Sequence, residues 1–79
     1  MARETLFATV LGEFDRLSSA EKAREALLAA GVPGPRISLG ENAGETWLLS
    51  VYAESSFERG RIQSLLQQHG ALHTEQREG

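Results

Sequence analysis

The residues of this chain that could take part in chemistry form a few small groups, and the first is its two histidines. His69 and His73 are four positions apart, which is the spacing of two metal ligands on one face of a helix. Gly70 follows His69 directly and is a typical residue just after a helix end, so we expect the two imidazoles to lie on different elements. Since the chain has no cysteine to support such a pair, we predict no metal site.

Glu13 and Asp15 form a second group, one on each side of Phe14. Two neighbouring carboxyl groups can act as general acid and general base. Carboxylates just before a helix also interact favourably with the positive end of its dipole, and they keep a loop hydrated. We expect this structural role for Glu13 and Asp15, and we predict no catalytic residue.

Arg16 and Asn42 resemble the residue pair of acylphosphatases, which have a similar fold. Asn42 is expected in a different loop from Arg16, and the glycine pattern that cradles phosphate is missing, so we predict no phosphatase site. Phe7 and Tyr52 on a sheet would suit stacking with RNA bases. The basic-aromatic signature of RNA-recognition modules is missing, and a net charge of −3 argues against a nucleic-acid partner.

The length of 79 residues predicts one domain over residues 1–79, with 1–4 and 77–79 frayed. A chain this short buries only about 60–65% of its unfolded surface, so its core is marginal unless something reinforces it. No apolar stretch approaches the roughly 20 residues needed to cross a bilayer. The N-terminal residues lack the continuous apolar core of a signal peptide, so we expect a cytoplasmic protein.

Alternation of apolar and polar side chains predicts four strands. The expected strands are 5–12, 36–40, 46–54 and 71–76. Gly12 is expected to end the first strand, and Leu72 and Thr74 are expected to share one side of the last. A polar loop over 41–45 suits a hairpin between the second and third strands.

Two helices, over 19–30 and 56–69, are predicted between these strands from apolar residues at helical spacing. Ser18 or Ser19 is expected to supply the N-cap oxygen of the first helix. Ser18 and Glu21 also have the spacing of a capping box. These start signals predict the beginning of the first helix.

Ser55 and Glu58 repeat the capping-box spacing before the second helix. Gly60 lies inside that helix at a cost of about 1 kcal/mol relative to alanine, and close packing against the sheet would explain it. Phe57 is expected at the start of the inner, apolar stripe of the same helix. Gly31 is expected to end the first helix in a left-handed conformation, and Gly70 is expected to end the second helix.

The resulting order of elements is βαββαβ. Right-handed crossovers around an antiparallel hairpin place the four strands in one antiparallel sheet with both helices on one face. This is the ferredoxin-like arrangement of the α+β class. The side chains expected on the helix-covered face are Leu6, Ala8, Val10, Ile37, Leu39, Trp47, Leu49, Val51 and Leu72.

The opposite face of the sheet is open unless a partner covers it. Its large side chains are expected to be Phe7, Leu11, Leu48 and Tyr52, which form a candidate interaction face of roughly a few hundred Å². Two such faces around a two-fold axis would make a homodimer, and another protein could bind the same face. Unpaired backbone groups at the second or fourth strand offer an alternative dimer contact at a sheet edge.

Residues 12–39, GEFDRLSSAEKAREALLAAGVPGPRISL, resemble the bacterial general stress protein domain, also called the heat-induced stress protein family. The shared features are Gly-x-Phe-Asp after a strand, an alanine-rich helix ending in Ala-Gly, and Ile-Ser after a turn. Residues 47–76 resemble the closing part of that domain, with an apolar strand, a helix and His-Gly-Ala. ENAGE stands where many members carry a long glycine-rich segment. The resemblance implies a compact, stress-linked cytoplasmic protein, from a family without a well-defined biochemical activity.

Two other families of the same topology leave alternatives open. Sporulation-related peptidoglycan-binding repeats carry Gly-x-Phe after strand one, as at residues 12–14, but they usually have a glutamine in that strand and work outside the cytoplasm. In amino-acid-binding regulatory domains, a small ligand would lie near residues 12–18. We predict a non-enzymatic structural or interaction module without a cofactor, because no convergent cluster of polar residues is visible.

Overall fold

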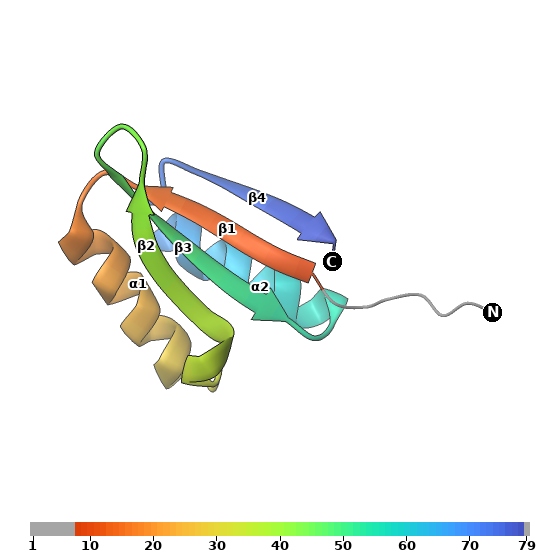
Figure 1. Cartoon of the computed structure of the whole chain (residues 1–79). Coiled ribbons are helices and arrows are strands. Elements are labelled where there is room, and N and C mark those ends of the chain that lie inside the picture. The colour runs from red at the N-terminus through yellow and green to blue at the C-terminus, as the bar shows by residue number, and fades with distance from the viewer. Residues whose placement is uncertain (1–7, 79) are drawn as a thin grey trace.

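The computed structural model describes residues 8–78 and has the predicted order of strands and helices (Figure 1). Every neighbouring pair in the sheet is antiparallel, and the strand order is β2-β3-β1-β4. This confirms the ferredoxin-like α+β fold. The elements are β1 (Ala8–Phe14), α1 (Leu17–Ala29), the 3-10 turn η1 (Gly34–Arg36), β2 (Ile37–Asn42), β3 (Thr46–Ala53), α2 (Ser56–Gln68) and β4 (His73–Glu78).

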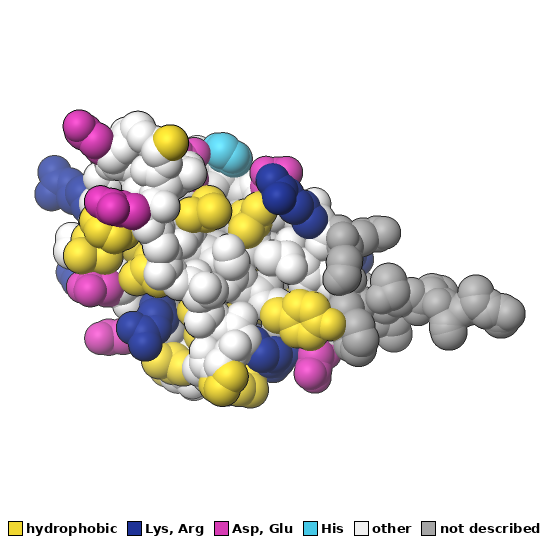
Figure 2. Space-filling view, viewed as in Figure 1, with side chains coloured by type: hydrophobic (Ala, Val, Ile, Leu, Met, Phe, Trp, Pro, Cys, Tyr) yellow, Lys and Arg dark blue, Asp and Glu magenta, His cyan; other side chains and the backbone are white. Residues whose placement is uncertain are grey.

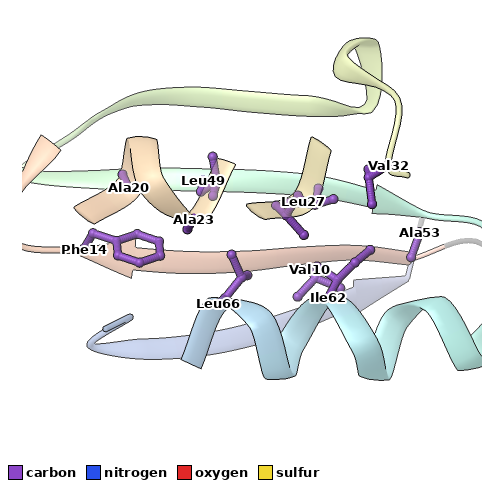
Figure 3. Close-up of a cluster of buried hydrophobic side chains, with 11 residues drawn as sticks. Val10, Phe14, Ala20, Ala23, Leu27, Val32, Leu49, Ala53, Ile62 and Leu66 are labelled. Carbon is purple, nitrogen blue, oxygen red and sulfur yellow. The ribbon is translucent and has the colours of Figure 1, made fainter. Parts of the chain in front are cut away.

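Both helices cover the same face of the sheet, as predicted (Figure 1). The register places Val10 of β1 opposite Val51 of β3 and opposite Gln76 of β4. Because opposed residues of an antiparallel pair share a face, this register fixes which side chains meet the helices. The buried cluster between the layers (Figure 3) is Val10, Phe14, Ala20, Ala23, Leu27, Val32, Leu49, Val51, Ala53, Ile62 and Leu66.

Most of the predicted helix-covered residues are where we expected them, at the buried cluster or packed against it. The exception among the described residues is Leu72, which is 57% exposed and precedes β4 instead of lying within it. The last strand begins at His73 and includes Arg77, which we expected in a frayed end. Leu6 and the predicted frayed start over 1–4 lie outside the described residues.

Gly12 does not end β1, contrary to the sequence prediction, because the strand continues to Phe14. A Cβ atom built on Gly12 would lie 3.0 Å from the side chain of Leu66 and 3.3 Å from that of Phe14. The glycine therefore allows α2 to approach the sheet closely, which is a common reason for glycine inside a strand. The longer strand also moves Glu13 from a loop into the sheet.

The start of α1 differs from the prediction, whereas both helix ends agree with it. The N-cap is Arg16, which makes no side-chain capping bond, so Ser18 and Ser19 lie within the first turn. The longer β1 leaves only two residues before α1, which explains the earlier start. Gly31 has φ +100° and donates to the Leu28 carbonyl.

Val32 donates to the Leu27 carbonyl at 3.0 Å and completes a Schellman motif at the end of α1. The end of α2 repeats this arrangement around Gly70, which has φ +93°. Its next residue, Ala71, donates to the Leu66 carbonyl at 3.1 Å. The two glycine stop signals therefore act as predicted.

The capping box of α2 is confirmed in part. The Ser55 hydroxyl accepts a hydrogen bond from the Glu58 backbone N–H at 3.0 Å. The Glu58 carboxylate accepts from the Glu54 N–H instead of returning to Ser55. Gly60 is exposed, and a Cβ atom there would have no neighbour within 4 Å, so our explanation by close packing is wrong.

Replacing Gly60 by alanine is therefore expected to stabilise the protein. The Gly60→Ala variant should gain about 1 kcal/mol in free energy of unfolding, because alanine restricts the unfolded chain and favours a helix. Urea unfolding followed by circular dichroism measures this change. Gly12→Val is the matched comparison and should lose about 1–3 kcal/mol through overpacking against Leu66. A lower free energy of unfolding for Gly60→Ala would contradict our conclusion that Gly60 has no packing role.

Candidate functional site

Three of the four residues predicted for the candidate interaction face are described, and Phe7 lies outside the described part of the chain. Leu11 is only 9% exposed, while Leu48 and Tyr52 are half-buried. The register places Ser50 opposite Leu11 and Thr9 opposite Tyr52. Small hydroxyl side chains therefore separate the apolar ones.

In the described part of this face, polar side chains interrupt the apolar ones. Figure 2 views it from the uncovered side and shows hydrophobic groups separated by uncharged polar side chains and backbone. Leu11 contributes little accessible area because its neighbours already cover it. Among residues 8–78, the accessible apolar area of this face therefore comes mainly from Leu48 and Tyr52, and this part has the mixed character of an ordinary protein surface.

Glu13 lies at one end of the open face and joins three strands. The Thr46 hydroxyl of β3 donates to Glu13 Oε2 at 2.8 Å. His73 of β4 lies opposite Glu13, with Nδ1 3.5 Å from Oε1. The sheet thus brings together Glu13 and His73, which the sequence analysis assigned to different groups.

The order of this Thr46–Glu13–His73 cluster decides what it can do chemically. The carboxylate is in the middle, so the hydroxyl donates to Glu13 and is not placed as a nucleophile activated by His73. The His73 side chain is 64% exposed, so water competes for its contact with Glu13 and the contact is weak. We interpret the cluster as a set of polar contacts that connects three strands and has a structural role.

Other candidate residues from the sequence lie apart from this cluster. His69 is the C-cap of α2, and Asp15 is exposed in the loop after β1. Arg16 occupies the N-cap position of α1 without a capping bond, whereas Asn42 ends β2. Within residues 8–78, no group of three or more His, Cys, Asp or Glu side chains is arranged to hold a metal ion.

A second polar cluster, at the start of α2, was not predicted. Arg36 at the end of η1 donates from Nη1 and Nη2 to the two carboxylate oxygens of Glu58, both at 3.0 Å. The Nη1 group also donates to the Tyr52 carbonyl at 3.1 Å. The pair is mostly enclosed, with side-chain exposures of 17% for Arg36 and 25% for Glu58.

The geometry of this pair affects both ionisable groups. Hydrogen bonding from Arg36 is the main cause that lowers the pKa of Glu58, and the Glu54 backbone N–H adds to it. The same hydrogen bond with Glu58 raises the pKa of Arg36. Bidentate pairs of this kind are stronger than single neutral hydrogen bonds. The capping-box spacing identified Glu58, but no local signal identified its partner 22 residues away.

A shallow groove runs along the outer side of α2. It has a volume of about 550 Å³ and is lined by Ser56, Phe57, Gly60, Arg61, Ser64, Leu65 and Gln68. Phe57 is 76% exposed, so its predicted place on the inner stripe is wrong. The groove is open and is formed by one helix, which makes it unlike the concave sites that enclose small ligands.

The region near residues 12–18, where the regulatory-domain alternative placed a ligand, is filled at its strand end. Phe14 is fully buried, and the Leu66 side chain packs on Gly12. No helix formed by residues 8–78 is long and apolar enough to cross a membrane. No protein-family model, curated protein or solved structure matches the chain.

The Arg36–Glu58 pair predicts a specific loss of stability in acid. Because the folded-state pKa of Glu58 lies below its ordinary value of 4.5, the unfolded state binds more protons in acid. The stabilisation is fully present at neutral pH and disappears as the pH falls through the folded pKa. Glu58→Gln should lose about 2 kcal/mol at pH 7 and show a flatter acid dependence in urea titrations.

Glu75→Gln provides the control for this titration. Glu75 pairs with Arg77, but both side chains are about half exposed or more, at 48% and 65%. Removing this surface pair should change stability by less than about 0.5 kcal/mol. Equal acid dependence in wild type and Glu58→Gln would contradict the stabilising role of the Arg36–Glu58 pair.

Proposed function

We propose that this protein is a non-enzymatic interaction module that binds a protein partner through its open sheet face. The observation that carries the proposal is the position of Leu11, Leu48 and Tyr52 on the face that neither helix covers. Aromatic, apolar and hydroxyl side chains together suit a partly polar protein interface. Tyr52 and Leu48 are its anchors, because Leu11 is already nearly buried.

The polar groups around this face support a structural role more than a catalytic one. The Glu13 carboxylate is bound by Thr46 and faces His73, and Glu75 is paired with Arg77. These polar groups contact one another across and along the strands. In an active site, by contrast, the polar groups point to a common position. They therefore form a polar border beside the apolar centre of the face.

We further propose a stress-linked role in the bacterial cytoplasm. It is supported by the resemblance of residues 12–39 and 47–76 to the general stress protein domain. The same proposal includes a homodimer. The contact between its two copies would be formed by the open face or by a sheet edge. An interaction module of this kind acts through what it binds, so its contacts are the property to test.

Site-specific photo-crosslinking in living cells tests the open face. With p-benzoylphenylalanine in place of Leu48, we expect one discrete covalent adduct after irradiation. Its mass identifies the partner, because a second copy doubles the mass of the chain and another protein gives a different value. Adding Tyr52→Glu should remove the adduct, since a buried charge at an anchor opposes binding.

The crosslinker in place of Glu25 serves as the matched control, because Glu25 is exposed on α1. This position should give no discrete adduct. Equal labelling from both positions, or none from position 48 in a folded protein, would overturn the proposed face.

A thermal-shift screen tests the proposal against the ligand-binding alternatives. Amino acids, nucleotides and muropeptides should leave the Tm of the protein unchanged, because the strand end near Gly12 is filled by Phe14 and Leu66. A rise of several degrees with one compound would favour a regulatory or peptidoglycan-binding domain through binding linkage.

A further inference from the structure

The most exposed large apolar side chain among the described residues lies on α2, on the helix side of the molecule. Phe57, in the first turn of this helix, is 76% exposed. It lines the shallow groove on the outer side of α2, together with Leu65, which is partly buried against the core. A single exposed aromatic residue is ordinary, but this one continues into a groove with a second apolar side chain. Burying an aromatic ring of this kind contributes strongly to binding.

The charge of the groove favours an acidic partner. Arg61 is the only charged residue among those that line it. Within residues 8–78, Arg61 makes no ion pair and no hydrogen bond. The carboxylate of Glu58 feels its charge, but Arg36 already bonds to both oxygens of that carboxylate. A carboxylate brought by a partner would therefore find a guanidinium with its donors free, and such charge-assisted bonds are strong.

The same charge argues against a second copy of this chain as the occupant. Two α2 helices packed around a two-fold axis in the groove would bring the same surface of each copy together. Arg61 lies near the middle of α2, so the two guanidinium groups would meet close to the axis. The groove has no acidic side chain to compensate them. Like charges placed together across an interface oppose association, so self-pairing is disfavoured.

The shape of the groove suits a helix better than an extended strand. All the residues that line it belong to α2, most of whose backbone N–H and C=O groups bond within the helix. An extended segment would find no row of free backbone groups there, whereas a helix satisfies its own. The 13 residues of α2 span about 20 Å, so an amphipathic helix of three to four turns covers the groove.

We propose that the outer groove of α2 binds an amphipathic helix of a partner protein, with apolar side chains against Phe57 and Leu65 and a carboxylate on Arg61. Gly60 fits this arrangement, because a Cβ atom there would have open space and a partner side chain can reach the helix backbone. That contact gives a reason for a glycine that weakens the free helix. The inference rests on the proposed role as an interaction module, but it uses the side of the molecule opposite the open face.

The size of the contact makes this complex a transient one. One helix against one helix buries less than the roughly 1,200 Å² of a standard interface. We therefore expect a dissociation constant on the order of tens of micromolar. The experiments below are designed for that range.

Selection from a displayed library of helical peptides tests the chemistry of the occupant. The library presents helices of about four turns with one randomised face, and the full chain is the target. Enriched peptides should carry Leu, Ile or Met at spacings of three and four residues, with Asp or Glu beside them. No enrichment, or a consensus rich in Lys and Arg, would overturn the proposal.

Fluorescence anisotropy with an enriched peptide locates the contact. Gly60→Gln fills the groove with a better helix former, so its expected tenfold or greater loss of affinity, about the same as for Phe57→Ala, would not result from unfolding. Arg61→Glu should weaken binding to a similar extent. A peptide with arginine in place of its acidic residue should then recover affinity for Arg61→Glu, because the opposed charges attract again.

Two controls separate this contact from other effects. Arg24→Glu changes the net charge of the chain by the same amount at an exposed position of α1, and it should leave peptide affinity unchanged. Leu48→Glu with Tyr52→Glu should also bind the peptide as wild type does, so failure of the open face is distinguishable from failure of the groove. Binding that is insensitive to Gly60→Gln would place the peptide elsewhere and contradict the inference.

Photo-crosslinking in living cells gives an independent measurement. With p-benzoylphenylalanine in place of Phe57, one aromatic side chain replaces another, and we expect one discrete adduct. Mass spectrometry of the joined peptide should identify a segment with acidic residues and apolar residues at helical spacing, and Gly60→Gln should remove the adduct. Crosslinking to a second copy, to a basic segment or to nothing in a folded protein would rule out the proposed occupant.

Discussion

One constraint governs this molecule: two helices of 13 residues each must bury one face of a four-stranded sheet. Only the central strands lie fully beneath them, so Val10, Leu49 and Val51 have no exposed surface. Toward the β2 edge, Ile37 and Leu39 remain partly accessible. The opposite face receives no cover from either helix. The surfaces available for binding are therefore those that so short a chain cannot enclose.

The Arg36–Glu58 pair reinforces this small core at one end. It connects η1 to the first turn of α2, and its third bond, to the Tyr52 carbonyl, attaches both to β3. Enclosing the guanidinium leaves its Nε without a hydrogen-bond partner, which carries a desolvation cost. The two charge-assisted bonds to the carboxylate offset that cost. The turn η1 is thereby held against the consecutive elements β3 and α2.

Local patterns in the sequence were sufficient for the fold, because each element carries its own signals. Alternation identified the strands, and Gly31 and Gly70 ended their helices in the left-handed conformation that glycine favours. The errors arose where a local signal has two physical meanings. Gly12 was interpreted as a strand end, although it allows close helix packing. Because of that error, the predicted first strand was too short and Ser18 was predicted as an N-cap residue.

The polar clusters could not be predicted in the same way. Glu13 meets His73 because the β1–β4 register opposes them, and a shift of one residue would turn one of them to the other face. Arg36 and Glu58 meet only after η1, β3 and α2 are in place. The open face was located correctly for Leu11, Leu48 and Tyr52, but its accessible area depends on neighbouring side chains and not on residue type.

The positions of the glycines connect these arguments. Gly12, Gly31 and Gly70 are explained within the single chain, by close packing or by positive φ. Gly40 and Gly60 are not, since a side chain at either would have open space. Each lowers the stability of a regular element, and each lies on a surface that the helices and strands leave uncovered. A small domain has little stability to lose, and the described residues offer no packing reason for glycine at either position.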